Sequence, residues 1–335
     1  MVSGRNIRWC FIVAGNSFSL VNRRDTFLVV LVAVLWGVNF VVIDWGMGEV
    51  PPLLFAAIRF TAVSAACFFV PRPPVPFATV AAVGAFMSLG QFGFLYMSMH
   101  LGMGPGVAAL VLQSQAVFTI VIASVALRER PTRAQVTGTG LGVLGLFVVA
   151  FGIGGRVPLA ALALCLLAGL SWGAGNVVSR ASGAPGGLAL TVWSATVVPV
   201  PLLGLSLLLD GPAAVGRGLA HLGWNGVLST VYTAGLCSLV GYSVFNRLLS
   251  RYPAGRVAPW ALLVPVIAMA SSWALLGEVP ASTELAGAAL LVIGVLTAQA
   301  IIRPPSHGLE GRSQDRSPER TVAASGSAGN EPTAR

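Results

Sequence analysis

The sequence predicts an all-α membrane protein with ten transmembrane helices, arranged as two inverted repeats of five helices. The chain of 335 residues is 56% hydrophobic and only 9% charged, whereas a soluble globular domain carries about 25% charged residues. Ten apolar stretches are each close to the length of about 20 residues that an α-helix needs to cross a bilayer. The second half also repeats short motifs of the first half. These three observations predict the fold class.

The apolar stretches follow one another through short connections rich in Pro, Gly and Arg, and no soluble domain is inserted. They lie near residues 26–45, 52–70, 77–99, 105–127, 134–152, 158–179, 187–209, 225–248, 255–276 and 282–302. The predicted organisation has four parts: a cytoplasmic N-terminal extension at 1–24, a first five-helix repeat at 25–152, a second at 153–302, and a cytoplasmic tail at 303–335. The tail is polar and charged, so we expect it to be disordered.

The arginines predict the orientation of the chain. All 20 basic residues are arginine, and basic residues collect in the cytoplasmic loops of membrane proteins. With the N-terminus in the cytoplasm, seventeen arginines fall in cytoplasmic segments and only Arg156 and Arg217 fall outside, while Arg59 lies within a span. An even number of spans then places both termini in the cytoplasm.

Several classes of protein are excluded by residues that are missing. Without lysine there is no Walker A phosphate loop and no Schiff-base chemistry. The sequence has no CxxC pair, no HExxH motif and no Ser–His–Asp set at plausible depth, so we expect no metal, no cofactor and no enzyme activity. The four cysteines and three histidines are scattered along the chain, at Cys10, Cys67, Cys165, Cys237, His100, His221 and His307. The net charge of +9 is read as a topology signal, not as a sign of nucleic-acid binding.

The two halves match at several positions in register. The matching pairs are Trp36–Asn39 with Trp172–Asn176, Val107–Leu112 with Val257–Leu262, Glu129–Pro131 with Glu278–Pro280, Gly138 with Gly287, and Gly145 with Gly294. Because each half has an odd number of spans, the two halves cross the membrane in opposite orientations. Inverted repeats are typical of secondary transporters, which hold substrate near the bilayer midplane between the halves.

These and neighbouring residues carry a resemblance to a known family. The segments that carry it include Trp36–Val42, Arg59-Phe60, Leu112–Ala116, Arg256–Pro259 and Leu262–Val266. Over residues 25–302 the chain resembles the EamA family of the drug/metabolite transporter superfamily, and within it the O-acetylserine/cysteine exporter type. The resemblance implies an inner-membrane exporter of amino-acid metabolites that works without ATP hydrolysis. One departure is Val279, where the family pattern leads us to expect arginine after the second-half glutamate.

Two alternatives to a cysteine/O-acetylserine-like exporter working by alternating access stay open. The first is a multidrug or other polar-metabolite exporter of the same superfamily. A nucleotide-sugar exporter would call for more basic residues to meet phosphates, and only Arg59 lies within a span. The second is an intramembrane lipid-modifying enzyme, which would need paired acids, histidines or a metal cluster at depth.

Arg59 is the sharpest candidate for substrate binding. It lies well inside the span that begins near Pro52, where a charge costs about 2.5–3.5 kcal/mol and is expected to face the interior or water. Its guanidinium group is suited to hold a substrate carboxylate. The structural alternative is an arginine paired with helix-end carbonyls or with a carboxylate such as Asp44 or Glu129.

Amide side chains within the spans are further candidates, because an amide can donate to a carboxylate and accept from an ammonium group. Gln91 lies in the third span. Gln113 and Gln115 lie in the fourth, and since they are two residues apart we expect them to point to different faces. Asn39 and Asn176 occupy related positions in the two halves. For all of these residues the alternative role is hydrogen bonding between helices.

The remaining candidates are aromatic residues and a proline. Trp36, Trp172, Tyr242 and Trp260 are candidates for cation–π contact with an ammonium group, although such residues are more often part of the core or the lipid interface. Pro259 is expected to kink the ninth span, and Pro265 to lie nearer the cavity.

Two glutamates and a glycine stripe complete the analysis. Glu129 and Glu278 end the fourth and ninth spans, where a negative charge opposes the helix dipole. We expect each to have a partner and to act as a gate or structural residue; for Glu129 the local choices are Arg128, Arg130 and Arg133. The stripe predicts close helix packing, either within a monomer or in a homodimer. Its members are Gly138, Gly142, Gly145, Gly287 and Gly294.

Overall fold

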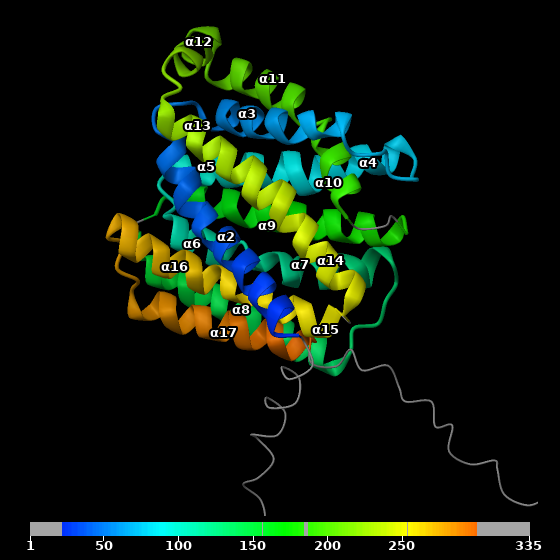
Figure 1. The fold of residues 1–335 in the computed structure, drawn as a ribbon. Coiled ribbons are helices and arrows are strands. Elements are labelled where there is room, and N and C mark those ends of the chain that lie inside the picture. Colours follow the sequence, from blue (N-terminus) through cyan, green and yellow to red (C-terminus); the bar gives the residue numbers. More distant parts are fainter. Residues whose placement is uncertain (1–21, 156, 184–186, 253, 300–335) are drawn as a thin grey trace, which may run out of the picture. The chain divides into compact units, whose positions relative to one another are not determined.

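The computed structural model describes residues 22–155, 157–183, 187–252 and 254–299, which form helices and the connections between them (Figure 1). This part of the chain contains no strand, in agreement with the predicted all-α class. The predicted tail, and the predicted N-terminal extension up to residue 21, lie outside the described residues.

Eight helical segments in the described part of the chain are long and apolar enough to cross a membrane. They are Arg23–Met47, Phe77–His100, Pro105–Ala126, Arg133–Ile153, Leu159–Ala181, Leu188–Leu209, Trp224–Arg251 and Pro259–Leu276. Two further apolar helical segments, Pro52–Phe68 and Ser282–Ala298, are shorter. Every predicted span therefore coincides with an apolar helical segment, and the count of ten crossings stays a prediction.

These segments are made of the following helices, given in chain order. The label α marks an α-helix, η1 and η4 are 3₁₀ helices, and η2 and η3 are π-helices. They are α2 (Arg23–Met47), α3 (Pro52–Ser64), η1 (Ala65–Phe68), α4 (Phe77–Val83), η2 (Gly84–Gly90), α5 (Gln91–His100), α6 (Pro105–Val111), α7 (Ser114–Ala126), α8 (Arg133–Ile153), α9 (Leu159–Ala181), α10 (Leu188–Ala195), α11 (Pro199–Leu209), α12 (Pro212–Ala220), α13 (Trp224–Thr230), η3 (Val231–Gly241), α14 (Tyr242–Arg251), α15 (Ala254–Val257), η4 (Ala258–Leu262), α16 (Leu263–Leu276) and α17 (Ser282–Gln299).

Several spans are interrupted, and proline accounts for two of the breaks. The seventh predicted span breaks before Pro199, which begins α11, and the ninth passes through the short 3₁₀ segment η4, which contains Pro259. Pro259 thus lies at the predicted kink. Pro265 is buried in the first turn of α16, where the missing N–H of proline costs the helix little.

Two π-helical segments lie in the third and eighth predicted spans. They are η2, which contains Ser88, and η3, which contains Ser238. In η3 the Ser238 hydroxyl donates to the Thr233 carbonyl at 2.9 Å, five residues back. A π-helical turn widens the backbone locally and often marks a functional site.

The glycine stripe packs α8 against α17 within one chain. A Cβ atom at Gly138 would lie 2.4 Å from the Gly294 carbonyl oxygen, and one at Gly145 would lie 2.8 Å from the Gly287 carbonyl oxygen. Side chains at these positions would collide with backbone, so only glycine permits this approach. Of the two kinds of packing that the stripe predicts, the structure contains the one within the chain.

Packing elsewhere also joins helices far apart in sequence. α2 packs along α16, α9 lies between α5 and α7, and α11 packs along α3. The main core is formed by large buried side chains such as Ile43, Phe55, Tyr96 and Leu110.

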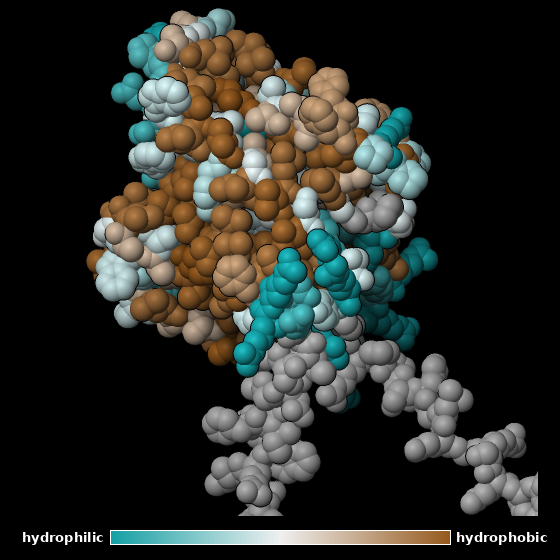
Figure 2. Space-filling model, in the orientation of Figure 1, coloured by the Kyte–Doolittle hydropathy of each residue, from teal (hydrophilic) through white to brown (hydrophobic). Residues whose placement is uncertain are grey.

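The outer surface is apolar over a wide area. Apolar side chains cover most of the face seen in Figure 2, while hydrophilic ones gather around α12 and where α2 begins and α14 ends. Many large apolar side chains are exposed, among them Phe151, Leu208 and Val125, each at least 77% exposed. A continuous apolar surface of this kind is typical of contact with lipid, not with water.

Candidate functional site

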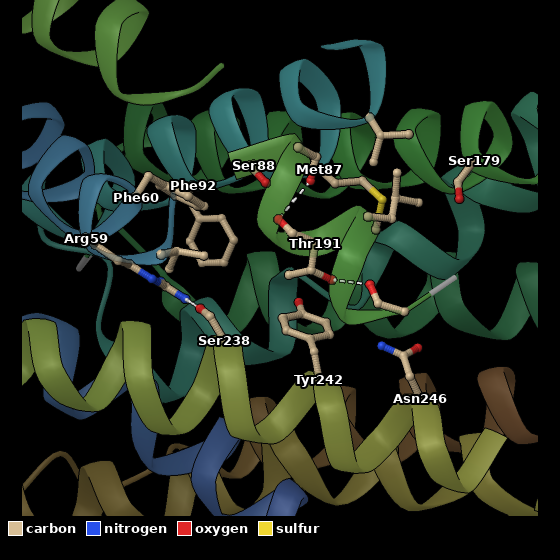
Figure 3. Close-up of a pocket in the computed structure, with 15 residues that line it drawn as sticks. Arg59, Phe60, Met87, Ser88, Phe92, Ser179, Thr191, Ser238, Tyr242 and Asn246 are labelled. Carbon is tan, nitrogen blue, oxygen red and sulfur yellow. Dashed lines mark hydrogen bonds between the residues drawn. The ribbon is translucent and has the colours of Figure 1, made fainter. Parts of the chain in front are cut away.

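A cavity of about 150 Å³ lies among α3, η2, α10, η3 and α14 (Figure 3). It extends from Arg59 on α3 to Ser179 near the end of α9 and Gly187 just before α10. Both π-helical segments contribute to its wall, through Ser88 and Ser238. Drug-sized ligands usually occupy about 300–1,000 Å³, so this cavity suits a small solute.

Arg59 is held at the wall of this cavity by neutral groups. Its side chain is 3% exposed. Nη1 donates to the Tyr96 hydroxyl at 3.2 Å and Nη2 donates to the Ser238 hydroxyl at 3.3 Å. The guanidinium carbon lies 4.2 Å from the centre of the Phe92 ring, a cation–π distance. Nε has no hydrogen-bond partner within the described residues.

No carboxylate neutralises Arg59 in the described part of the chain, where the ion pairs join other residues. The structural alternative predicted a partner such as Asp44 or Glu129. Glu129 instead pairs with Arg180 at 2.7 Å, and the ion pairs among the described residues do not include Asp44. The predicted pairing of Arg59 with Glu129 is therefore wrong. The predicted local partners of Glu129, which were Arg128, Arg130 and Arg133, are wrong as well. A buried cation without a counter-ion is costly, and an anion in the cavity would offset that cost.

The other polar groups of the cavity are uncharged. Thr191 donates to the Gly187 carbonyl at 3.1 Å, and Ser194 donates to the Thr191 carbonyl at 3.1 Å. With their protons donated, both hydroxyl oxygens still accept hydrogen bonds. Figure 3 shows Tyr242 and Asn246 rising from α14 toward Thr191 on α10. The cavity thus combines one cation with neutral donors and acceptors.

Apolar side chains form the rest of the cavity wall. They are Phe60, Val63, Val83, Met87, Phe92 and Leu190. Such a wall, with a few placed polar groups, is typical of a small-molecule site.

A second cavity of about 230 Å³ lies beyond the opposite end of α5 and contains two glutamates. Glu278 accepts a hydrogen bond from the Ser272 hydroxyl, and Glu284 accepts from the Ala281 backbone N–H at 3.1 Å. A Cβ atom at Gly104 would lie 2.8 Å from both carboxylate oxygens of Glu278, so this glycine makes room for the carboxylate. The two cavities lie toward opposite ends of α5, since Ser88 precedes this helix and Gly102 follows it.

Comparison with known proteins agrees with this arrangement. The model of the EamA-like transporter family matches residues 25–151 and 159–298. The chain belongs to the EamA-like transporter family. The resemblance inferred from the motifs is therefore confirmed.

Two relatives of this EamA-like transporter are named "Probable amino-acid metabolite efflux pump". The protein of Salmonella typhimurium is 40% identical over 281 residues, and that of Escherichia coli is 38% identical over 281 residues. Each alignment covers 82% of this chain and 94% of the relative. A protein with a solved crystal structure matches 84% of this chain and 98% of its own, with a TM-score of 0.55 and 18% identity. That likeness concerns the fold.

The EamA-like transporter brings two of the predicted substrate residues, Arg59 and Tyr242, to the wall of the first cavity. Trp36 lies behind Tyr242, with ring centres 5.1 Å apart, and its indole N–H donates to the Cys237 carbonyl at 3.1 Å. Gln91 lies one turn after Ser88 and is 1% exposed, and neither its amide nitrogen nor its amide oxygen has a partner among the described residues.

The other predicted residues lie outside the lining of both cavities. The Asn176 amide donates to the Thr119 hydroxyl at 3.3 Å and so links α9 to α7, whereas the buried Asn39 oxygen has no partner in the described residues. Trp260 packs beside a small apolar cluster. Trp172 and Pro265 border neither cavity.

The expectation that Gln113 and Gln115 point to different faces is wrong. The Gln115 amide donates to the Gln113 amide oxygen at 3.4 Å. The helical spacing does not apply because α6 ends at Val111 and α7 begins at Ser114. Gln113 therefore lies in the break between the two helices.

Sequence reasoning missed most of the neutral groups around Arg59. Tyr96 and Ser238 contact the guanidinium group directly, and Ser88, Thr191 and Asn246 line the cavity. Hydroxyl groups are common in transmembrane helices, so they give little signal by themselves. The π-helical segments single out Ser88 and Ser238, but they are visible only in the structure.

A polar cluster joins the start of α2 to the end of α14. The Tyr252 hydroxyl donates to Asp25 at 2.6 Å, and Arg251 lies 4.0 Å from the same carboxylate. The hydrogen bond to Asp25 raises the pKa of the Tyr252 hydroxyl above its usual value. Tyr252 therefore stays protonated and keeps donating throughout the physiological pH range.

Removing the Glu129–Arg180 ion pair is expected to change stability little. Both side chains are about half exposed, and exposed ion pairs contribute about 0–1 kcal/mol. Glu129→Gln and Arg180→Gln should each shift the thermal unfolding midpoint in detergent by at most a few degrees, and the double variant should match either single one. A loss of folded protein in either single variant would contradict this expectation.

Proposed function

We propose that this EamA-like transporter exports small amino-acid metabolites of the cysteine and O-acetylserine kind from the cell by alternating access. The observation that carries the proposal is Arg59, a buried guanidinium group at the wall of a small cavity that has no counter-ion among the described residues. A substrate carboxylate supplies the missing negative charge. The printed names of the two relatives support the same class of substrate.

The proposal includes ten crossings in two inverted halves, and reciprocal packing supports it. The first predicted span packs on the ninth, through α2 and α16. The equivalent spans of the other halves, the sixth and the fourth, also pack together, through α9 and α7. The third and eighth spans both contain π-helical turns, and the fourth and ninth are both interrupted. The fifth and tenth meet at glycines from each half. Related elements of the two halves thus make related contacts, as an inverted repeat requires.

The proposed orientation makes the first cavity the cytoplasmic one. Arg180 and Arg251 lie at the ends of the helices that border it, and arginine is retained in the cytoplasm. The cavity that holds Arg59 would then be loaded from inside the cell, while the second cavity lies on the outer side. An exporter needs a binding cavity that is open to the cytoplasm before it takes up substrate, and the first cavity would meet this need.

Labelling of single cysteines tests the orientation. In a variant whose native cysteines are replaced by serine, Glu49→Cys and Arg217→Cys should react with a membrane-impermeant maleimide in intact cells. Arg130→Cys should react only after the membrane is opened. All three positions are exposed. The reverse pattern would show that the chain is inserted the other way round.

Solute flux in proteoliposomes tests the function itself. Vesicles that contain the protein and are loaded with labelled cysteine or O-acetylserine should release it faster than protein-free vesicles. Release of neither compound, together with release of unrelated cationic or apolar drugs, would instead support a multidrug exporter.

A further inference from the structure

The first cavity matches only one of the two charges of an amino acid. Arg59 is the sole charged residue among the described residues that line it. An amino acid carries an ammonium group as well as a carboxylate. The lining therefore supplies a counter-charge for the carboxylate but none for the ammonium group.

The neutral groups of the cavity offer the ammonium group hydroxyl acceptors and the ring of Tyr242, but no opposite charge. The face of Phe92, which would suit a cation, already lies 4.2 Å from the guanidinium carbon of Arg59. An ammonium group in a cavity of about 150 Å³ also lies near the positive charge of Arg59, which repels it. Entry of the ammonium group thus loses hydration without gaining an opposite charge.

Part of the cavity wall suits an uncharged substituent better than an ammonium group. Val83, Met87 and Leu190 contribute apolar surface to the same cavity as the hydroxyls of Ser88 and Thr191. An acyl amide presents one N–H donor, one carbonyl acceptor and a methyl group. Such a group can bond to these hydroxyls and bury its methyl against the apolar side chains.

We propose, building on the proposed function, that the transporter recognises the carboxylate of its substrate and not the ammonium group. Small carboxylic acids whose amino group carries an acetyl group are then carried at least as well as the free amino acids. Amines without a carboxylate are rejected. The size of the cavity restricts the acyl group to a short one.

Two isomers make the test sharp. O-Acetylserine and N-acetylserine have the same atoms, but only the first has an ammonium group. Serine methyl ester keeps the ammonium group and lacks the carboxylate. Each compound is labelled, and its efflux from proteoliposomes is measured at pH 6, where the protonated amine of O-acetylserine cannot attack its own ester.

We expect the transport efficiency for N-acetylserine to equal or exceed that for O-acetylserine, and the efficiency for serine methyl ester to be below one tenth of either. Arg59→Gln should lower the flux of both carboxylates about 10-fold or more. The matched control is Arg217→Gln, which removes an exposed arginine outside both cavities and should leave both fluxes unchanged. The thermal unfolding midpoint of each variant shows whether it is folded.

The outcomes separate this inference from the proposed function. Flux of O-acetylserine without flux of N-acetylserine overturns the inference and leaves the exporter in place. Equal flux of serine methyl ester also overturns it, because the carboxylate would then be unnecessary. Absence of flux for both carboxylates overturns the inference and the proposed function together.

Discussion

Arg59→Ala is expected to lower the efficiency of cysteine and O-acetylserine transport about 10- to 100-fold, because a hydrogen bond to a charged group contributes about 1.5–3 kcal/mol. The guanidinium group lies at the cavity wall and contacts Tyr96, Ser238 and Phe92, all neutral. Its removal leaves no buried carboxylate unpaired, so we expect the variant to fold. Initial rates of flux in proteoliposomes, normalised to the amount of folded protein, measure the effect.

Arg59→Lys distinguishes charge from geometry. Lysine keeps the positive charge but lacks the planar pair of donors that matches a carboxylate. We therefore expect an efficiency between those of the wild type and Arg59→Ala. If Arg59→Ala transported as fast as the wild type, the arginine would be structural and the carboxylate would have to be bound elsewhere.

Gly138→Ala is expected to destabilise the protein by about 1–3 kcal/mol, the usual cost of overpacking. The added Cβ would lie 2.4 Å from the Gly294 carbonyl oxygen and 2.6 Å from the Ala298 backbone nitrogen. Backbone atoms cannot rotate away as a flexible side chain does. The two helices must therefore separate, and the thermal unfolding midpoint in detergent should fall by several degrees.

Gly140 supplies the matched control on the same helix. A Cβ at this position would have no atom within 4 Å. Because alanine is favoured over glycine in a helix by about 0.5–1 kcal/mol, Gly140→Ala should leave the midpoint unchanged or raise it. Equal losses of stability in both variants would contradict this expectation, because the loss could then not come from contact between α8 and α17.

Hydropathy predicts where the helices lie but not how they are interrupted. The predicted spans 134–152 and 158–179 coincide closely with α8 and α9. The π-helical segments η2 and η3 were not predicted. A run of apolar residues reports burial in lipid, and it carries no information on which carbonyl each backbone N–H contacts.

The candidate site was only partly predictable for a related reason. Arg59 stands out because a charge within an apolar stretch is costly. Its contacts Tyr96 and Ser238 lie 37 and 179 residues away in sequence, so only the fold brings them together. Gln113 and Gln115 were assigned to different faces on the assumption of an unbroken helix, and the break at residues 112–113 removes that assumption.

The close contacts between α8 and α17 also limit how the two halves can move. Gly138 meets Gly294, and Gly145 meets Gly287, so there are two contact points seven residues apart, or about 10 Å along a helix. Two rigid bodies that stay joined at two points can only rotate about the line through those points, and here that line runs along α8. Displacement grows with distance from such an axis. In the proposed alternating-access cycle, helices remote from it, such as α3 and α11 in Figure 1, would travel furthest.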